Sequence, residues 1–257
     1  MEKRIKYNLD TKGLVAVCLI GLVLLQACQY EGKSESDFSG GSGTGGSMAR
    51  FTIAGNHLYT VDQYSLKVFD VTNPRQPEFK ISKSVGFDVE TIFPLNTNLF
   101  LGTSSGMYIY DITAPASPQK ISYFEHIISC DPVVADGNYA YVTLSSSNQR
   151  CWRGSNELQI IDIRNLQNPT LVKQYPLTGP RGLAIRNDSL WVCDNGLKIL
   201  DTRNKQDIKL LVHFPELSAY DLILNRNLIM VTGETGFVQY KLENNAIRKL
   251  SEIKVLP

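Results

Sequence analysis

Three aspartates are the first candidates for chemistry in this sequence. Asp88, Asp131 and Asp221 occur at similar places in three repeats of the chain. Converging carboxylates can coordinate Ca²⁺, or they can serve as the acid and base of glycoside hydrolysis. The structural alternative is that each aspartate accepts hydrogen bonds from loop backbone N–H groups while Arg181 balances their charge. Distances between side chains decide among these interpretations, so the sequence leaves all three open.

Trp152 is a second candidate, because it lies in the polar segment SSSNQRCWRGSN between Arg150 and Arg153. A tryptophan in such a loop can anchor a partner or cover a channel as a lid. Local catalytic motifs are missing. His57, His126 and His213 have no nucleophile at a recognisable spacing, and no Gly-x-Ser-x-Gly, P-loop, His-Glu-x-x-His or dinucleotide fingerprint occurs. We therefore expect no catalytic residues and no enzyme.

Composition places the chain among globular proteins. Its 257 residues are 43% hydrophobic and 20% charged, which is enough for a sizeable core. Lys and Arg number 26 against 25 Asp and Glu, a net charge of +1. A near-neutral chain has no electrostatic footprint for nucleic acid, so we expect neither DNA nor RNA as a partner.

The N-terminal segment is typical of an export signal. Residues 1–13 are net basic, and residues 14–25 (LVAVCLIGLVLL) are uncharged. This run is too short for a membrane-spanning helix, which needs about 20 residues, but it fits a secretory signal. Leu25-Gln26-Ala27-Cys28 resembles a bacterial lipobox, which implies removal of residues 1–27 and lipidation of Cys28. An ordinary cleaved signal followed by an incidental cysteine is the alternative.

A flexible tether is expected at residues 28–48, because residues 29–47 are rich in Gly and Ser. Its acidic residues are Glu31, Glu35 and Asp37. In some Gram-negative groups, acidic residues near a lipidated cysteine favour export to the cell surface. We therefore expect a protein anchored to a membrane by its N-terminal lipid, in the outer membrane or at the cell surface of a Gram-negative bacterium.

The remaining cysteines predict a disulfide. Cys130 and Cys151 should lie on one face of the fold in an oxidising compartment, and a bond between them would contribute about 3 kcal/mol. Cys193 lies in the strand-like run LWVCD and is expected to be a small buried hydrophobe. A zinc site is not expected, because no Cys-x-x-Cys occurs and the histidines are far apart in sequence.

One pattern recurs about every 40 residues from Met48 onward. Its copies are LKVFD (66–70), MYIYD (107–111), LQIID (158–162), LKILD (197–201) and the altered FVQYK (237–241). Three further short runs rich in Val, Ile, Leu and Tyr accompany each copy, so every unit predicts four strands.

Units of this size match the blades of a β-propeller. The predicted fold is all-β: a five-bladed β-propeller of four-stranded antiparallel blades over residues 49–257. The blades are expected at 49–86, 87–125, 126–178, 179–216 and 217–257. A β-sandwich or a β-solenoid is the alternative. The first and last runs complete different blades, so we expect the ring to close by side-chain packing between blades one and five.

The turns after the recurring pattern support this assignment. Asp70-Val-Thr-Asn-Pro74 and Asp111-Ile-Thr-Ala-Pro115 each end a strand with an aspartate that can cap a turn, and the proline cannot continue the strand. The pattern and the Asp-x-x-x-Pro turn together resemble the LVIVD-repeat proteins. That resemblance implies a β-propeller outside the cytoplasm, often a bacterial lipoprotein, and it implies no common reaction.

In a propeller, the loop that enters the innermost strand of each blade and the loop that joins its second and third strands lie at the same face. We expect this face to be the binding rim. The candidate rim residues are Asp88, Glu90, Asp131, Trp152, Arg153, Arg181, Tyr220 and Asp221. No metal or other cofactor is expected, with Ca²⁺ at the channel mouth as the alternative. We expect a binding or scaffold module that grips another envelope protein through this rim. The alternatives are a lipoprotein that captures a glycan or small ligand, and a propeller hydrolase or lactonase.

Overall fold

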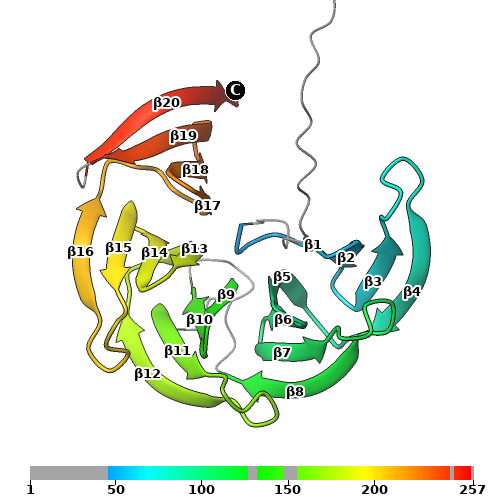
Figure 1. Cartoon of the computed structure of the whole chain (residues 1–257). Helices are drawn as coiled ribbons and strands as arrows, with labels where there is room; N and C mark the ends of the chain where they lie inside the picture. The colour runs from blue at the N-terminus through cyan, green and yellow to red at the C-terminus, as the bar shows by residue number, and fades with distance from the viewer. Residues whose placement is uncertain (1–45, 127–131, 147–154, 244–245, 256–257) are drawn as a thin grey trace, which may run out of the picture. The chain divides into compact units, whose positions relative to one another are not determined.

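The computed structural model describes residues 46–126, 132–146, 155–243 and 246–255, all within the unit Gly40–Pro257. Five antiparallel sheets of four strands follow one another along the chain (Figure 1). The first sheet contains β1 (Phe51–Ala54), β2 (His57–Val61), β3 (Ser65–Asp70) and β4 (Glu78–Ser84). The second contains β5 (Val89–Leu95), β6 (Asn98–Thr103), β7 (Gly106–Asp111) and β8 (Gln119–Glu125).

The other three sheets repeat this order. The third contains β9 (Val133–Asp136), β10 (Tyr139–Leu144), β11 (Glu157–Asp162) and β12 (Thr170–Pro176). The fourth contains β13 (Pro180–Arg186), β14 (Ser189–Asp194), β15 (Leu197–Asp201) and β16 (Lys209–Phe214). The fifth contains β17 (Asp221–Asn225), β18 (Leu228–Gly233), β19 (Gly236–Glu243) and β20 (Ala246–Lys254). The predicted fold class is confirmed: the chain is a five-bladed β-propeller.

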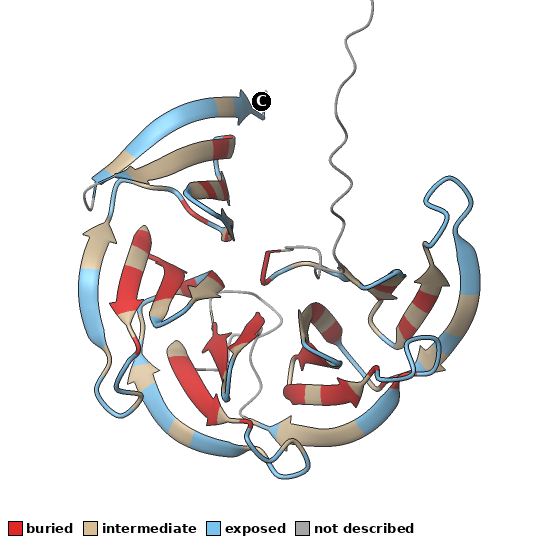
Figure 2. Cartoon of the chain, viewed as in Figure 1, coloured by how far each residue is buried: buried red, intermediate tan, exposed pale blue. Residues whose placement is uncertain are grey.

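Period-two alternation explains how the blades stack. Successive side chains of a strand point to opposite faces, so each blade has one face toward the preceding blade and one toward the following blade. Both faces are apolar at the junctions, where four clusters of buried side chains join the blades in chain order. The inner strands are mostly buried and the outer strands mostly exposed (Figure 2). Within the described ranges, no helix has the length and apolarity needed to cross a bilayer.

The ring is open between the fifth and the first blades (Figure 1). Adjacent blades pack through their innermost strands: β1 on β5, β5 on β9, β9 on β13, and β13 on β17. No comparable packing joins β17–β20 to β1–β4 in the described residues. The expected closure by side-chain packing between blades one and five is therefore not found.

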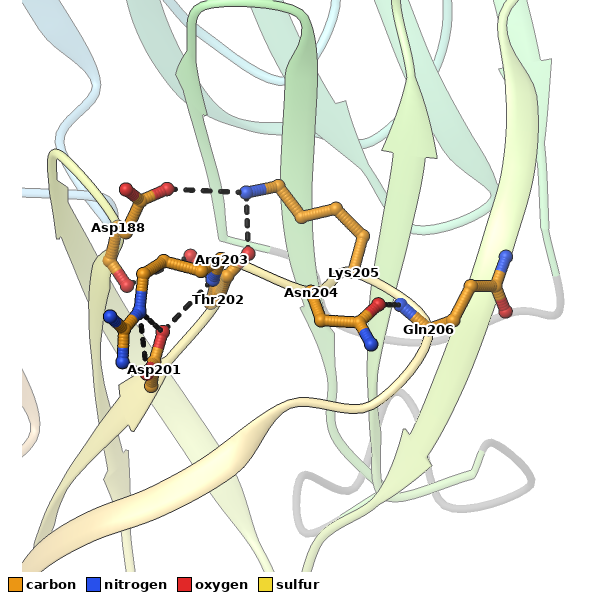
Figure 3. Close-up of polar contacts among 7 residues, drawn as sticks. All are labelled: Asp188, Asp201, Thr202, Arg203, Asn204, Lys205 and Gln206. Carbon is orange, nitrogen blue, oxygen red and sulfur yellow. Dashed lines mark hydrogen bonds and ion pairs between the residues drawn. The ribbon is translucent and has the colours of Figure 1, made fainter.

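The aspartates that end the third strands cap the turns that follow them. The Thr72 amide donates to Asp70 at 2.9 Å and the Arg203 amide to Asp201 at 3.0 Å. Figure 3 shows the turn of blade four, where the Asp201 carboxylate also accepts a hydrogen bond from the Arg203 guanidinium. In the same turn the Lys205 ammonium lies 3.6 Å from the Asp188 carboxylate. Hydrogen bonds from the Thr72 and Arg203 side chains and amides lower the pKa of Asp70 and Asp201 to about 2.

The capped turns of blades two and four also contact the preceding blade. The Tyr59 hydroxyl of blade one donates to the Pro115 carbonyl of blade two at 3.0 Å. The Tyr175 hydroxyl of blade three likewise donates to the Lys205 carbonyl of blade four at 2.9 Å. The recurring aspartate therefore serves blade stacking at the face opposite the expected rim.

These turns predict acid lability. A carboxyl whose folded pKa is lowered stabilises the fold above its unfolded pKa, near 4, and this stability is lost as the pH falls toward the folded pKa. We expect a constant melting temperature from pH 7 down to about 5, then a steep fall between about pH 4 and 2. Thermal melts across this range test the expectation, and the double variant Asp70→Asn, Asp201→Asn should show a shallower fall. An equally steep fall in the variant would contradict it.

Candidate functional site

The expected rim is formed by the loops between blades and by the turns between second and third strands. The described part of the chain includes Asp88, Glu90, Arg181, Tyr220 and Asp221 of the predicted set. Asp131, Trp152 and Arg153 lie outside the described residues, as do Cys130 and Cys151. The predicted disulfide and the role of Trp152 therefore stay predictions.

Asp88 is an exposed residue of the connection between β4 and β5. Its backbone has a positive φ of 54°, a conformation that aspartate tolerates better than most residues. Its carbonyl accepts the Ser104 amide at 3.2 Å, and its carboxylate accepts the Ser104 hydroxyl at 3.3 Å. Asp88 thus ties its loop to the turn after β6. Glu90 follows it in β5 and is partly buried.

Asp221 has a different environment, at the start of the innermost strand of blade five. Its carboxylate accepts the Ser47 hydroxyl at 3.0 Å and the Met48 amide at 3.2 Å. The Ser47 oxygen in turn accepts the Leu183 amide of β13 at 2.8 Å. Burial raises the pKa of the Asp221 carboxyl, and the hydrogen bonds from Met48 and Ser47 offset only part of that shift.

This cluster links the start of the folded chain to blades four and five, and we call Ser47, Met48, Leu183 and Asp221 the clasp. Glycines make it possible, because a Cβ on Gly46 or Gly182 would lie only 2.1 Å or 2.2 Å from an Asp221 oxygen. Ser47 is 1% exposed. No local pattern indicates the role of Ser47, since a serine in a Gly/Ser-rich segment is typical of a linker.

A pocket of about 290 Å³ lies between blades four and five, next to the clasp. Arg181 and Tyr220 are among its lining residues, and the Arg181 guanidinium lies 4.0 Å from the centre of the Tyr220 ring. The polar side chains of Thr178, Asn195 and Ser218 also line it. The structure thus brings two predicted rim residues together in one pocket, with Asp221 directly after Tyr220 in the chain.

A buried ion pair holds the loops of this pocket. Asp194 is 1% exposed and accepts the Thr178 amide at 3.0 Å and the Gly179 amide at 2.8 Å. The Lys198 ammonium lies 2.6 Å from the same carboxylate. Removing one partner of such a buried pair costs far more than the pair contributes, because the other charge is left uncompensated. Asp194 therefore fixes the loop between β12 and β13, which precedes Arg181.

Cys193 lies at the lining of the pocket and is 1% exposed, which confirms the expectation of a small buried hydrophobe. Burial, and then the charge of Asp221, raise the pKa of its thiol. A thiol in this state carries little nucleophilic thiolate at neutral pH. Among the described residues, no three His, Cys, Asp or Glu side chains gather in a way that could hold a metal ion. Because Asp131 is not described, the Ca²⁺ alternative stays untested.

Comparison with protein families identifies the repeat. The LVIVD repeat family matches residues 45–84 and 129–176, so the resemblance expected from the sequence is confirmed. The curated proteins give no match. The same fold occurs in solved structures of low identity, which establish the fold alone.

Three of these structures cover most of the chain. A protein from Lactobacillus plantarum has a TM-score of 0.60 at 11% identity, over 76% of this chain and 67% of that one. The periplasmic gluconolactonase of Pseudomonas aeruginosa has a TM-score of 0.60 at 12% identity, over 78% and 68%. A candidate 6-phosphogluconolactonase from Bacteroides fragilis has a TM-score of 0.59 at 9% identity, over 80% and 69%.

These names correct one expectation. The absence of local motifs led us to expect no enzyme, but propellers of this fold include proteins named as lactonases. Propeller enzymes assemble their sites from residues scattered over several blades, so the absence of a local motif does not bear on catalysis. The expectation that the protein is not an enzyme is therefore wrong. Hydrolysis of a lactone is an activity that should be measured.

Proposed function

We propose that this chain, a five-bladed β-propeller with LVIVD repeats, is a lipid-anchored envelope protein that captures a small hydroxylated anion in the pocket between blades four and five. The observation that carries the proposal is the position of Arg181 against the Tyr220 ring at the edge of that pocket. Sugar acids and the acidic ends of glycans have the chemistry that such a pocket would recognise.

The charge of Arg181 is available to a ligand. In the described ranges, no carboxylate lies within ion-pair distance of its guanidinium. Its contact with the Tyr220 ring orients the guanidinium plane, and a planar guanidinium binds carboxylate with two parallel hydrogen bonds. We therefore assign Arg181 to the anionic group of the ligand.

The rest of the pocket suits a sugar. Thr178, Asn195 and Ser218 offer hydroxyl and amide groups for hydrogen bonds, and the Tyr220 ring offers a face for C–H groups. A volume near 290 Å³ is at the lower end of ligand pockets, which run from about 300 to 1,000 Å³. A single sugar unit fits this size better than a chain of several.

Anchoring supplies the setting of this proposal. The lipobox-like Cys28 and the Gly/Ser-rich tether would keep the propeller close to a membrane, in the outer membrane or at the cell surface. Protein binding at the rim was the first expectation from the sequence, and it centred on Trp152 and Arg153. Those residues lie outside the described part, so we rest the proposal on the pocket instead.

Replacing Arg181 should weaken the binding of a sugar acid. We expect the full chain in mild detergent to bind gluconate or glucuronate, and Arg181→Gln to bind it about 10–100-fold more weakly, because a charge-assisted bond to carboxylate is lost. Isothermal titration calorimetry measures both affinities. Arg203→Gln is the matched control, since Arg203 bonds Asp201 in a turn at the opposite face, and it should leave the affinity unchanged.

Two further results bear on the proposal. The absence of heat with sugar acids at millimolar concentration would overturn the assignment. Turnover of a sugar lactone above its spontaneous rate, lost in Arg181→Gln, would make the same pocket a hydrolytic site.

A further inference from the structure

The two ends of the open ring expose side chains that would be buried in the interior of the ring. At the register position of Phe51, the residues of the other four blades are at most 1% exposed: Ile92, Val133, Leu183 and Leu222. Phe51 itself is 59% exposed. Each of the four equivalents packs against the preceding blade. Phe51 is exposed because none of the described blades packs against this side of blade one.

We call Phe51, Leu58 and Phe69 the blade 1 face. These three side chains share one face of the sheet. Leu58 on β2 pairs with Phe69 on β3. Phe51 on β1 pairs with Thr60, which lies two residues from Leu58 on β2 and so points to the same face. The residues equivalent to Leu58 in the other blades are buried: Leu99, Ala140, Leu190 and Ile229. The residues equivalent to Phe69 in blades two to four are buried as well: Tyr110, Ile161 and Leu200.

Blade five shows the complementary pattern on its outward face. At the register position of Met230, the residues of the other blades are at most 1% exposed and pack against the following blade: Tyr59, Phe100, Tyr141 and Trp191. Met230 is only partly buried, as are Ile223 beside it and Phe237, while Ile253 is 69% exposed. We call Ile223, Met230, Phe237 and Ile253 the blade 5 face.

We propose that a second copy of this chain covers these faces, with the blade 5 face of one copy packed on the blade 1 face of another. The argument is continuity with an interface that the molecule already forms four times. At every junction in the ring, one blade packs the face that points toward the following blade against the face of the next blade that points back. The blade 5 face is of the first kind and the blade 1 face is of the second. They are therefore the two halves of the same repeated interface.

The polar residues at these faces permit the contact. Lys67 of blade one already pairs with Asp62 at 2.9 Å, so it brings no uncompensated charge. Gln239 of blade five is neutral and accepts the Ser251 hydroxyl at 2.9 Å. Lys241 shares the blade 5 face with Gln239, and its ammonium pairs with Glu243 at 2.7 Å. Both lysines are therefore compensated, and the apolar side chains form the centre of the interface, as is typical of stable homomeric contacts.

Sedimentation velocity of the full chain in mild detergent tests the proposal across a hundredfold range of protein concentration. We expect the wild type to move from one chain to two or more as the concentration rises. Phe51→Lys and Met230→Lys should each raise the dissociation constant at least tenfold. Leu211→Lys is the matched control, because Leu211 is an exposed leucine on the outer strand of blade four, and it should associate as the wild type does.

Mixing the two variants makes the test specific for a head-to-tail contact. The Phe51→Lys chain keeps its blade 5 face and the Met230→Lys chain keeps its blade 1 face, so the mixture should form a heterodimer that grows no further. A wild type that stays monomeric at every concentration would overturn the proposal. It would also be overturned if either variant, with an unchanged melting temperature, associated as strongly as the wild type, or if a different protein occupied the faces.

Discussion

Replacing Trp191 with alanine should lower the free energy of unfolding by about 3–5 kcal/mol. Trp191 is 1% exposed and belongs to the cluster that joins blades four and five, where Leu222 and Ile229 also lie. Removing the indole leaves a cavity that the surrounding strands cannot close, because backbone hydrogen bonds within each blade keep the strands in place. Urea denaturation followed by circular dichroism measures the loss.

Met230→Ala is the matched control, because Met230 occupies the same register position in blade five as Trp191 does in blade four. Its face has no following blade, so its truncation should cost about 1 kcal/mol or less in dilute solution. Trp191→Phe should cost less than Trp191→Ala, since a phenyl ring fills more of the space and the indole Nε1 bonds no atom of the described residues. Similar losses for Met230→Ala and Trp191→Ala would contradict an open ring.

Replacing Asp221 with alanine should lower the free energy of unfolding by about 1–3 kcal/mol, because the buried Ser47 hydroxyl loses its acceptor and the exposed Met48 amide loses a weaker bond. The Ser47 hydroxyl and the Met48 amide both donate to this carboxylate, and Ser47 is buried. The clasp joins the start of the folded chain to β13 and β17, so its loss also frees the segment that precedes β1. Denaturation of the full chain measures the cost.

A double-mutant cycle separates the clasp from local damage. Ser47→Ala removes the donor to Asp221 and the acceptor of the Leu183 amide, and it should cost about 1–2 kcal/mol. The double variant should cost clearly less than the sum of the single variants, because the residues act in one network. Strict additivity would contradict the clasp.

The pH dependence of Asp221 should oppose that of the turn aspartates. A raised folded pKa gives stability that is present below the unfolded pKa, near 4, and that is lost as the pH rises through the folded pKa. Relative to Asp221→Asn, the wild type should therefore be more stable at low pH than at neutral pH. The difference between their denaturation midpoints at about pH 4 and 7 measures the effect. An equal difference at the two pH values would mean that burial does not raise this pKa.

The sequence determined the blades by itself. Period-two alternation and turn residues act between neighbours in the chain, so LKVFD, MYIYD and their repeats specify strands and their pairing locally. The capping role of Asp70 and Asp201 is of the same kind, because the carboxylate and the amide it accepts are two residues apart. The burial of Cys193 followed from its place in an apolar strand.

Only the tertiary structure decided how the ring ends and where its pocket lies. Ser47 and Asp221 are 174 residues apart, and no local pattern distinguishes Ser47 from the other serines of its segment. The opening between blades five and one depends on the angles between adjacent blades, added over the four junctions. No single repeat encodes this sum. Arg181 and Tyr220 meet for the same reason: both were expected at the rim, but the packing of whole blades sets the distance between them.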